Sequence, residues 1–216
     1  MDDTLLKQAR PLNLRNGGQT CAIPPIVLMT DDLRLPDPHT AIKQLPRDSM
    51  VVFRHYIHPD RYQFAQSLRQ LCKARHIPFL VANDLALALQ ISADGIHLPE
   101  YRILQTPGIY RQLPRKMLVT SACHSLTTLR HLGLLHPLDR PDGVMISPLF
   151  ATQSHPGASS LPLARMRQMA SQCHQLGIVP IGLGGINHKT CRFLRSSTLA
   201  SLAGIGFSSE QSAPLR

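Results

Sequence analysis

Aromatic side chains are scarce in this sequence: it contains no tryptophan, and aromatics make up 5% of its 216 residues. Surfaces that bind nucleic acids usually interleave basic residues with stacking aromatic rings. The 23 basic residues outnumber the 13 acidic ones, but they are spread thinly along the chain. The formal charge of +10 therefore favours anionic ligands through its long-range field, and nucleic-acid binding is the least favoured function.

Paired cysteines and long apolar runs are also lacking. The five cysteines form no C-x-x-C pair and have no zinc-knuckle spacing, so we expect reduced, mostly buried thiols. No apolar run reaches the roughly 18 residues that a membrane span needs. The N-terminal stretch MDDTLLKQAR lacks the apolar core of a secretion signal. We therefore expect a cytoplasmic protein without a membrane span.

What the chain does contain is a series of short apolar runs separated by helix-like stretches. Apolar residues at three- and four-residue spacing, such as Leu126, Leu129 and Leu132, predict amphipathic helices. This alternation is typical of repeated βα units around a parallel sheet. The predicted strands are Ile26–Thr30, Met50–Arg54, Phe79–Ala82, Gly95–Leu98, Met117–Thr120, Gly143–Ile146, Val179–Leu183 and Leu202–Phe207.

Eight strands favour a closed barrel over a doubly wound sheet. We predict an α/β fold, a (β/α)8 TIM barrel in residues 26–216, with a short or missing last helix because few residues follow Phe207. Residues 1–25 are expected to form an N-terminal arm, with a short helix over Thr4 to Arg10. The missing helix would leave a thin spot that this arm or a partner subunit could cover. A homodimer is a hypothesis on that ground alone.

Ligands of such barrels bind where the strands end and the βα loops begin. The candidate site residues are therefore those that follow each predicted strand. They are Arg54, Asn83, Asp84, Arg102, Ser121, His124, Thr152, His155, Gly184, Gly185, Ser208 and Ser209.

Five stretches of these loops, taken in order, resemble the thiamine phosphate synthase and TenI family across residues 26–209. They are Leu28-Met29-Thr30-Asp31; Ala82-Asn83-Asp84 leading to Ala93-Asp94-Gly95-Ile96-His97-Leu98; Ser121 to Ser125; Ser147 to Thr152 with His155-Pro156-Gly157; and Gly182-Leu183-Gly184-Gly185-Ile186. Each stretch is weakly specific by itself, whereas five in order are specific.

The resemblance implies a synthase that joins a pyrimidine diphosphate to a thiazole phosphate and releases pyrophosphate, with a magnesium ion on the diphosphate. Asp84 matches the first magnesium-binding aspartate, but Arg102 stands where the second is expected. Of the Gln-x-Arg-x-Lys after the second strand only Arg54 remains, and His155 replaces a loop lysine. Arg54, Arg102 and His155 could instead neutralise an anion without magnesium. Asp84 has a second interpretation, as the N-cap of the next helix.

The TenI branch of the family implies a different reaction. There a histidine that matches His124, in a stretch beginning at Ser121, moves a proton during thiazole tautomerisation, a role that suits the pKa of imidazole. This chain has one extra residue in that stretch, so His124 could equally be a histidine at a helix start. Asn83, Thr152, His155 and Arg102 would contact substrate.

A phosphorylated small molecule is the expected ligand. Gly184 and Gly185 after the seventh strand, with Ser208 and Ser209 after the eighth, predict a phosphate cradle. The alternative for the glycines is a tight turn that needs them for backbone conformation alone. Three functions stay open: an enzyme of thiamine biosynthesis, either synthase or tautomerase; a non-catalytic relative that binds a thiamine-pathway phosphate; and a basic protein that associates with RNA.

Overall fold

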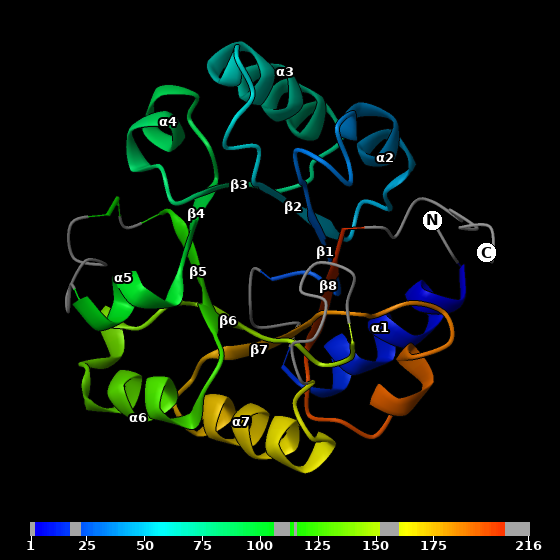
Figure 1. Cartoon of the computed structure of the whole chain (residues 1–216), viewed down its shortest axis with the longest axis vertical. Helices are drawn as coiled ribbons and strands as arrows, with labels where there is room; N and C mark the ends of the chain where they lie inside the picture. Colours follow the sequence, from blue (N-terminus) through cyan, green and yellow to red (C-terminus); the bar gives the residue numbers. More distant parts are fainter. Residues whose placement is uncertain (1–2, 18–22, 106–112, 115, 152–159, 206–216) are drawn as a thin grey trace.

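The computed structural model describes residues 3–17, 23–105, 113–114, 116–151 and 160–205. Parallel strands close into a barrel in sequence order, with β1 paired to both β2 and β8 (Figure 1). The strands are β1 Ile26–Met29, β2 Ser49–Phe53, β3 Phe79–Ala82, β4 Gly95–Leu98, β5 Leu118–Cys123, β6 Gly143–Ile146, β7 Val179–Leu183 and β8 Ser201–Gly204. The predicted eight-stranded parallel barrel is thus confirmed.

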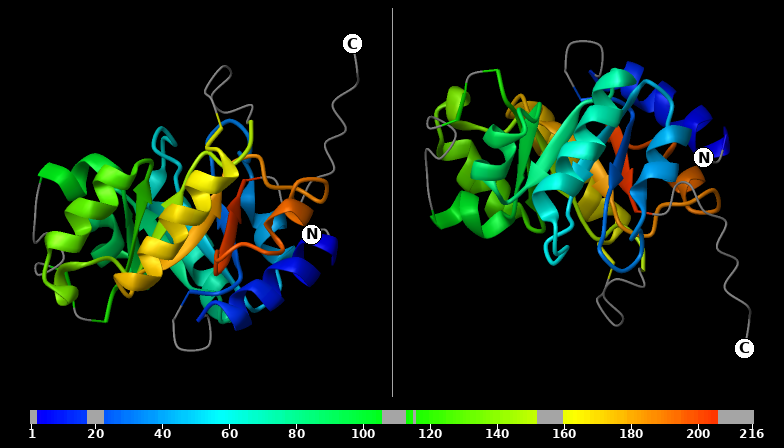
Figure 2. Two further views of the ribbon diagram at one scale, coloured as in Figure 1. Left: turned by 90° about the horizontal axis from the view of Figure 1, so that it is seen from below. Right: turned by 90° about the horizontal axis from the view of Figure 1, so that it is seen from above.

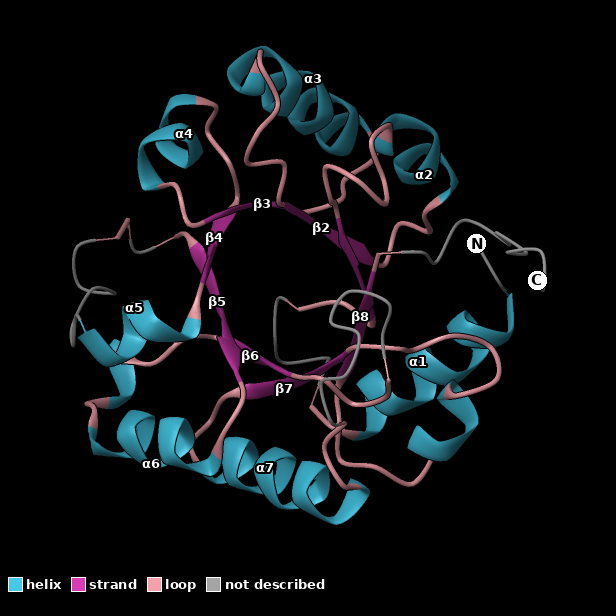
Figure 3. Cartoon of the chain, in the orientation of Figure 1, coloured by secondary structure: helices cyan, strands magenta, loops and turns pink. Residues whose placement is uncertain are grey.

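Helices surround the ring of strands (Figure 3). They are α1 Asp3–Arg15, α2 Pro38–Gln44, α3 Arg61–Ala74, α4 Leu85–Gln90, α5 Glu100–Gln105, α6 Leu126–Leu134 and α7 Leu163–Gln175, with 3-10 helices η2 Pro137–Asp139 and η3 Cys191–Leu194. The predicted apolar face of α6 is the buried one, since Leu129 and Leu132 are fully buried. None of the helices in the described ranges is both long and apolar enough to cross a membrane.

Two apolar layers result from the alternation of side chains along each strand. One fills the barrel interior and includes Met29, Val52, Leu80, Met145 and Ile181. The other lies between the sheet and the helices, where the alternate residues of the same strands meet the helices. Parity along a strand therefore decides whether a side chain faces the interior or the helices.

The N-terminal segment forms a longer helix than expected. The predicted short helix over Thr4 to Arg10 is part of α1, which continues through Pro11 to Arg15 and lies along β8 and η3 (Figure 2). Leu5, Ala9 and Leu12 of α1 are buried. The Asn13 amide donates hydrogen bonds to the carbonyls of Ile23 (3.2 Å) and Ala200 (2.9 Å). The chain thus covers this side of the barrel itself, so the thin spot that suggested dimerisation is filled.

The cysteines of the described part are free and buried; they are Cys72, Cys123, Cys173 and Cys191. Burial raises the pKa of the Cys72 and Cys123 thiols to about 12. These thiols stay protonated near neutral pH, as a buried structural cysteine should. The prediction of buried thiols is confirmed for these four, and Cys21 lies outside the described residues.

Packing of α1 gives a first testable prediction. A Leu12→Ala protein should lose about 2–5 kcal/mol of stability because the side chain is removed from a buried contact with the barrel. A Leu14→Ala protein is the matched control, since Leu14 on the same helix is 60% exposed and should change stability by less than about 0.5 kcal/mol. Urea unfolding of both proteins measures the difference. Equal losses would mean that α1 does not pack on β8 in solution.

Candidate functional site

The carboxyl ends of the eight strands lie at one end of the barrel, and most predicted site residues that the structure describes follow them there. Arg54 follows β2, Asn83 and Asp84 follow β3, Arg102 lies in α5 after β4, His124 follows β5, and Gly184 and Gly185 follow β7. Thr152, His155, Ser208 and Ser209 lie outside the described residues.

His124 begins the loop after β5 and is held from two sides. Its ring nitrogen Nδ1 lies 3.1 Å from the backbone oxygen and 3.2 Å from the hydroxyl of Ser147, which follows β6. Its backbone N–H donates to Glu100 Oε1 at 2.8 Å. The same carboxylate oxygen accepts from the Thr128 hydroxyl of α6. The exposed imidazole is thus fixed in orientation at the barrel mouth, as a group that transfers a proton must be.

Ser121 is not brought to this mouth. The structure extends β5 to Cys123, so Ser121 lies within the strand and is fully buried. By alternation it shares the side of Val119 and Cys123, which pack in the layer between sheet and helices. Its hydroxyl has no hydrogen-bond partner in the described part of the chain. The structure therefore separates Ser121 from His124, with which the sequence had grouped it.

Arg54 is positioned through the loop after β1. Its backbone N–H donates to the Thr30 hydroxyl at 2.8 Å, and that hydroxyl also lies 2.9 Å from Nδ1 of the buried His55. The Arg54 guanidinium lies 3.7 Å from Asp31 Oδ2. The pKa of Asp31 falls to about 2: burial opposes ionisation, but hydrogen bonds and charge from Arg34 outweigh it. Arg54 is therefore held at the mouth beside a carboxylate that already has an arginine partner.

Asp84 is the N-cap of α4, which was one of the two interpretations of this residue. Its Oδ1 accepts the Leu87 N–H at 3.0 Å, satisfying one of the free amides of the first helical turn. Its Oδ2 is bound by the guanidinium of Arg61, the first residue of α3. Arg61 also donates to the His55 carbonyl at 2.6 Å. Both carboxylate oxygens of Asp84 are thus in use within the protein.

Asn83 connects the ends of β3 and β4. Its φ of +53° is left-handed, a conformation that asparagine tolerates better than most residues. The amide donates to the Tyr101 hydroxyl at 3.2 Å, and its Oδ1 lies 3.4 Å from Arg102 Nε. Asn83 and Arg102, both predicted to bind substrate, are therefore neighbours.

A second histidine lies deeper in the barrel. His97 of β4 is nearly buried, and its Nδ1 is 3.0 Å from the Thr120 hydroxyl of β5. Burial, then the charges of Arg54 and His124, lower the pKa of His97 to about 3. His97 is therefore neutral near pH 7.

Gly184 and Gly185 form a turn whose backbone conformation and close packing favour glycine at both positions. Their φ values are +104° and +64°. A Cβ on Gly185 would lie 2.6 Å from the Ala151 carbonyl oxygen and 2.7 Å from Phe150 Cβ. The turn is pinned to the loop after β6, because the Phe150 N–H donates to the Gly184 carbonyl. The tight-turn interpretation therefore holds. The phosphate contact stays a prediction, since glycine backbone also allows a ligand to approach closely.

The model of the family described as thiamine monophosphate synthase (TMP-TENI) matches residues 41–206. This chain belongs to the thiamine monophosphate synthase family. The recognition that rested on five short stretches is thereby confirmed.

Curated sequences named as thiamine-phosphate synthases are moderately similar to this chain. It is 27% identical over 145 residues to "Putative thiamine-phosphate synthase 2" of Aquifex aeolicus, which covers 67% of this chain and 73% of that protein. It is 28% identical over 169 residues to "Thiamine-phosphate synthase" of Latilactobacillus sakei, covering 74% of this chain and 65% of that protein. The match therefore leaves part of each relative's length unaligned.

A solved structure of the same family has the same fold. "Thiamine phosphate pyrophosphorylase" from Pyrococcus furiosus superposes with a TM-score of 0.65 at 21% identity, covering 89% of this chain and 88% of the other. At that identity the likeness shows the barrel fold alone.

The magnesium ion that the family resemblance implies does not fit the residues present. Magnesium is held through carboxylates in near-octahedral geometry. The oxygens of Asp84 are occupied by Arg61 and the Leu87 amide, and the position expected to hold the second aspartate carries the cationic Arg102. Within the described ranges, no three acidic, histidine or cysteine side chains are grouped as a metal site. Sequence reasoning did not identify Arg61, because its partner Asp84 is 23 residues away, after the next strand.

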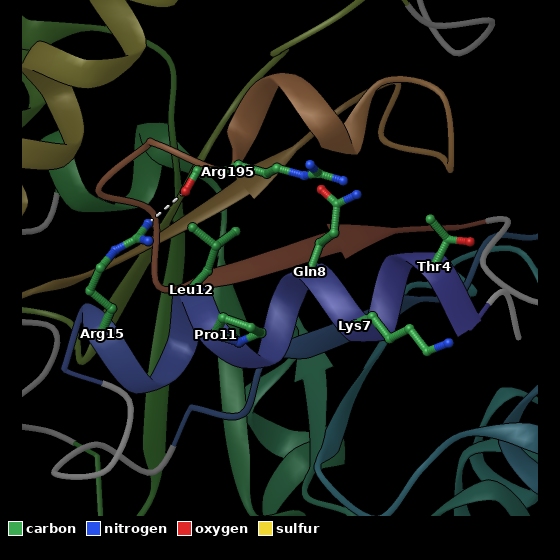
Figure 4. Close-up of a pocket in the computed structure, with 7 residues that line it drawn as sticks. All are labelled: Thr4, Lys7, Gln8, Pro11, Leu12, Arg15 and Arg195. Carbon is green, nitrogen blue, oxygen red and sulfur yellow. Dashed lines mark hydrogen bonds between the residues drawn. The ribbon is translucent and has the colours of Figure 1, made fainter.

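Two surface hollows lie away from these residues. One, of about 420 Å³, is lined by α1 residues including Lys7, Gln8 and Arg15 and by Arg195 (Figure 4). The other, of about 440 Å³, lies where strands begin, near Arg69, Asp94 and Leu118. Neither includes a predicted site residue. The candidate site is therefore defined by side chains at the strand ends.

Proposed function

We propose that this protein binds a phosphorylated thiazole of thiamine biosynthesis at the carboxyl ends of its strands and couples it to a pyrimidine diphosphate, as the family's synthases do. The observation that carries the proposal is that Arg54, Asn83, Arg102 and His124 all follow strands at the same end of the barrel, in a chain of this family. Asn83 and Arg102 would contact substrate. Gly184 and Gly185 would let their backbone amides approach the thiazole phosphate.

The chemistry would place negative charge where the cations are. In the coupling that the family implies, the bond between the pyrimidine methylene carbon and the diphosphate oxygen breaks, and its electron pair leaves with the diphosphate. The thiazole nitrogen then captures the cationic carbon. Groups that stabilise the negative charge on the departing oxygens lower the free energy of the transition state of this reaction most. Arg54 and Arg102 are the groups that this chain offers for that task.

A tautomerase is the second candidate function, and a specific contact favours it. Nδ1 of His124 is used by Ser147, so the ring is held in one orientation while the side chain stays exposed. A histidine fixed in this way suits proton transfer to a thiazole carbon. The non-catalytic alternative keeps the binding and drops both reactions.

The decisive experiment combines a binding and a turnover measurement on the purified protein. Calorimetry with thiamine phosphate is expected to show saturable binding, and incubation of thiazole phosphate with the pyrimidine diphosphate is expected to yield thiamine phosphate. A His124→Asn protein separates the two reactions: coupling should fall only modestly, whereas tautomerisation should fall by about 10²–10⁴. If the wild-type protein neither bound thiamine phosphate nor formed it, the proposal would be overturned.

A further inference from the structure

Arginine side chains follow two strands of the barrel, β2 and β4, which lie on either side of β3. Arg54 follows β2, Arg61 begins α3 next to it, and Arg102 lies in α5 after β4. Two half-exposed tyrosines, Tyr56 and Tyr101, lie among them. These five residues are called the arginine cluster below.

Several contacts connect the residues of the arginine cluster. The Arg61 guanidinium lies 5.9 Å from the centre of the Tyr56 ring, and that of Arg102 lies 6.0 Å from the Tyr101 ring. Arg61 is also paired with Asp84, which directly follows Asn83 in the sequence. Asn83 joins Tyr101 to Arg102. The cluster is therefore one continuous surface rather than three separate arginines.

The positive charge of this surface is only partly balanced. Asp84 neutralises Arg61. Asp31 lies 3.7 Å from Arg54 but only 2.6 Å from Arg34, which takes most of its hydrogen-bonding capacity. Arg102 has no carboxylate within ion-pair distance in the part of the chain that the structure describes. Arg54 and Arg102 are thus available for a further anion.

We propose that Arg54 and Arg102 bind the diphosphate of the substrate directly, so that this site works without a divalent metal ion. This inference rests on the proposed function and adds the mode of diphosphate recognition to it. A guanidinium presents two parallel N–H groups to phosphate oxygens and stays charged at any physiological pH. Arg102 thereby supplies positive charge itself, at a position where a carboxylate would supply it by binding a metal ion.

The Arg61–Asp84 pair supports the same inference. A metal ion bound at Asp84 Oδ2 would compete with the Arg61 guanidinium, whose side chain is only 20% exposed. Breaking a partly buried ion pair leaves its partner charge without compensation. The pair holds Arg61 in place instead, and the positive charge that stays unbalanced is that of Arg54 and Arg102.

Calorimetry with inorganic pyrophosphate as the probe, in chelator and in excess magnesium, tests the inference. Binding in chelator is expected to be at least as tight as in magnesium, because the free anion is the species that the arginines bind. An Arg102→Ala protein should bind about tenfold or more weakly in chelator, since a charged hydrogen bond is lost. An Arg130→Ala protein is the matched control: Arg130 is an exposed arginine on α6, and its removal changes the net charge equally.

The outcomes separate this inference from the proposed function. Pyrophosphate binding that requires magnesium, no pyrophosphate binding in either condition, or equal weakening by the Arg102 and Arg130 substitutions would each overturn the inference. Thiamine phosphate, titrated into the same samples, reports on the proposed function independently. If thiamine phosphate bound while pyrophosphate required magnesium, the function would stand and the metal-free site would fall. If pyrophosphate bound in chelator and thiamine phosphate did not bind, the metal-free anion site would stand and the proposed function would fall.

Discussion

A Gly185→Ala protein is expected to lose about 2–5 kcal/mol of stability, as the sum of left-handed backbone strain and overpacking. The φ of Gly185 is +64°, and a Cβ there would lie 2.6 Å from the Ala151 carbonyl oxygen and 2.7 Å from Phe150 Cβ. One obstacle is backbone, so no side-chain rotation relieves it. The turn after β7 would have to move away from the loop after β6.

Gly177 offers a control that isolates the clash from the backbone strain. Its φ is +71°, close to that of Gly185, but an added Cβ would meet nothing within 4 Å. A Gly177→Ala protein should therefore lose only the strain, about 1–2 kcal/mol. Urea unfolding compares the two. Under the proposed function, affinity for thiamine phosphate should also fall more than tenfold for Gly185→Ala and stay unchanged for Gly177→Ala. Equal effects of the two substitutions would show that the close approach is absent.

The barrel was predictable from the sequence because most of its strands are short, continuous apolar runs. Phe79–Ala82, Gly95–Leu98, Gly143–Ile146 and Val179–Leu183 were predicted with the bounds that the structure has. Strand β5 was predicted to end at Thr120 but ends at Cys123. Its last residues, Ser-Ala-Cys, are small and only weakly apolar, so they carry little strand signal. Because β5 continues beyond Thr120, Ser121 lies within the strand on its helix-facing side and not in the loop at the barrel mouth.

Side-chain contacts between residues far apart in the chain could not be predicted from the sequence. The capping role of Asp84 follows from residue type and position and could be predicted, whereas its contact with Arg61 depends on two neighbouring strands bringing α3 and α4 together. Helix α1 was underestimated for a related reason. Pro11 removes a helical hydrogen bond and suggests an end at Arg10, but burial of Leu12 and the Asn13 hydrogen bonds to Ile23 and Ala200 hold the helix together beyond it.

His97 makes the stability of the protein depend on pH between about 3 and 6.5. Burial is the main cause that lowers its pKa from 6.5 to about 3. Between these values the unfolded chain binds a proton at His97 and the folded chain does not, so folding is favoured as the pH rises. The full contribution is present above pH 6.5 and is lost as the pH falls toward 3. The slope expected from this one group is about 1.4 kcal/mol per pH unit.

A His97→Asn protein should remove that slope while keeping a polar atom near the Thr120 hydroxyl. Lowering the pH from 6.5 to about 4.5 is expected to cost the wild-type protein about 2–3 kcal/mol more than the variant. The low pKa of Asp31, about 2, puts its own loss of stability below this range. His55, whose pKa burial also lowers, contributes to both proteins and cancels in the comparison. Urea unfolding at several pH values gives the two slopes. Parallel pH dependences would mean that the imidazole is hydrated and titrates normally, and that the interior beneath the arginine cluster is wet rather than packed.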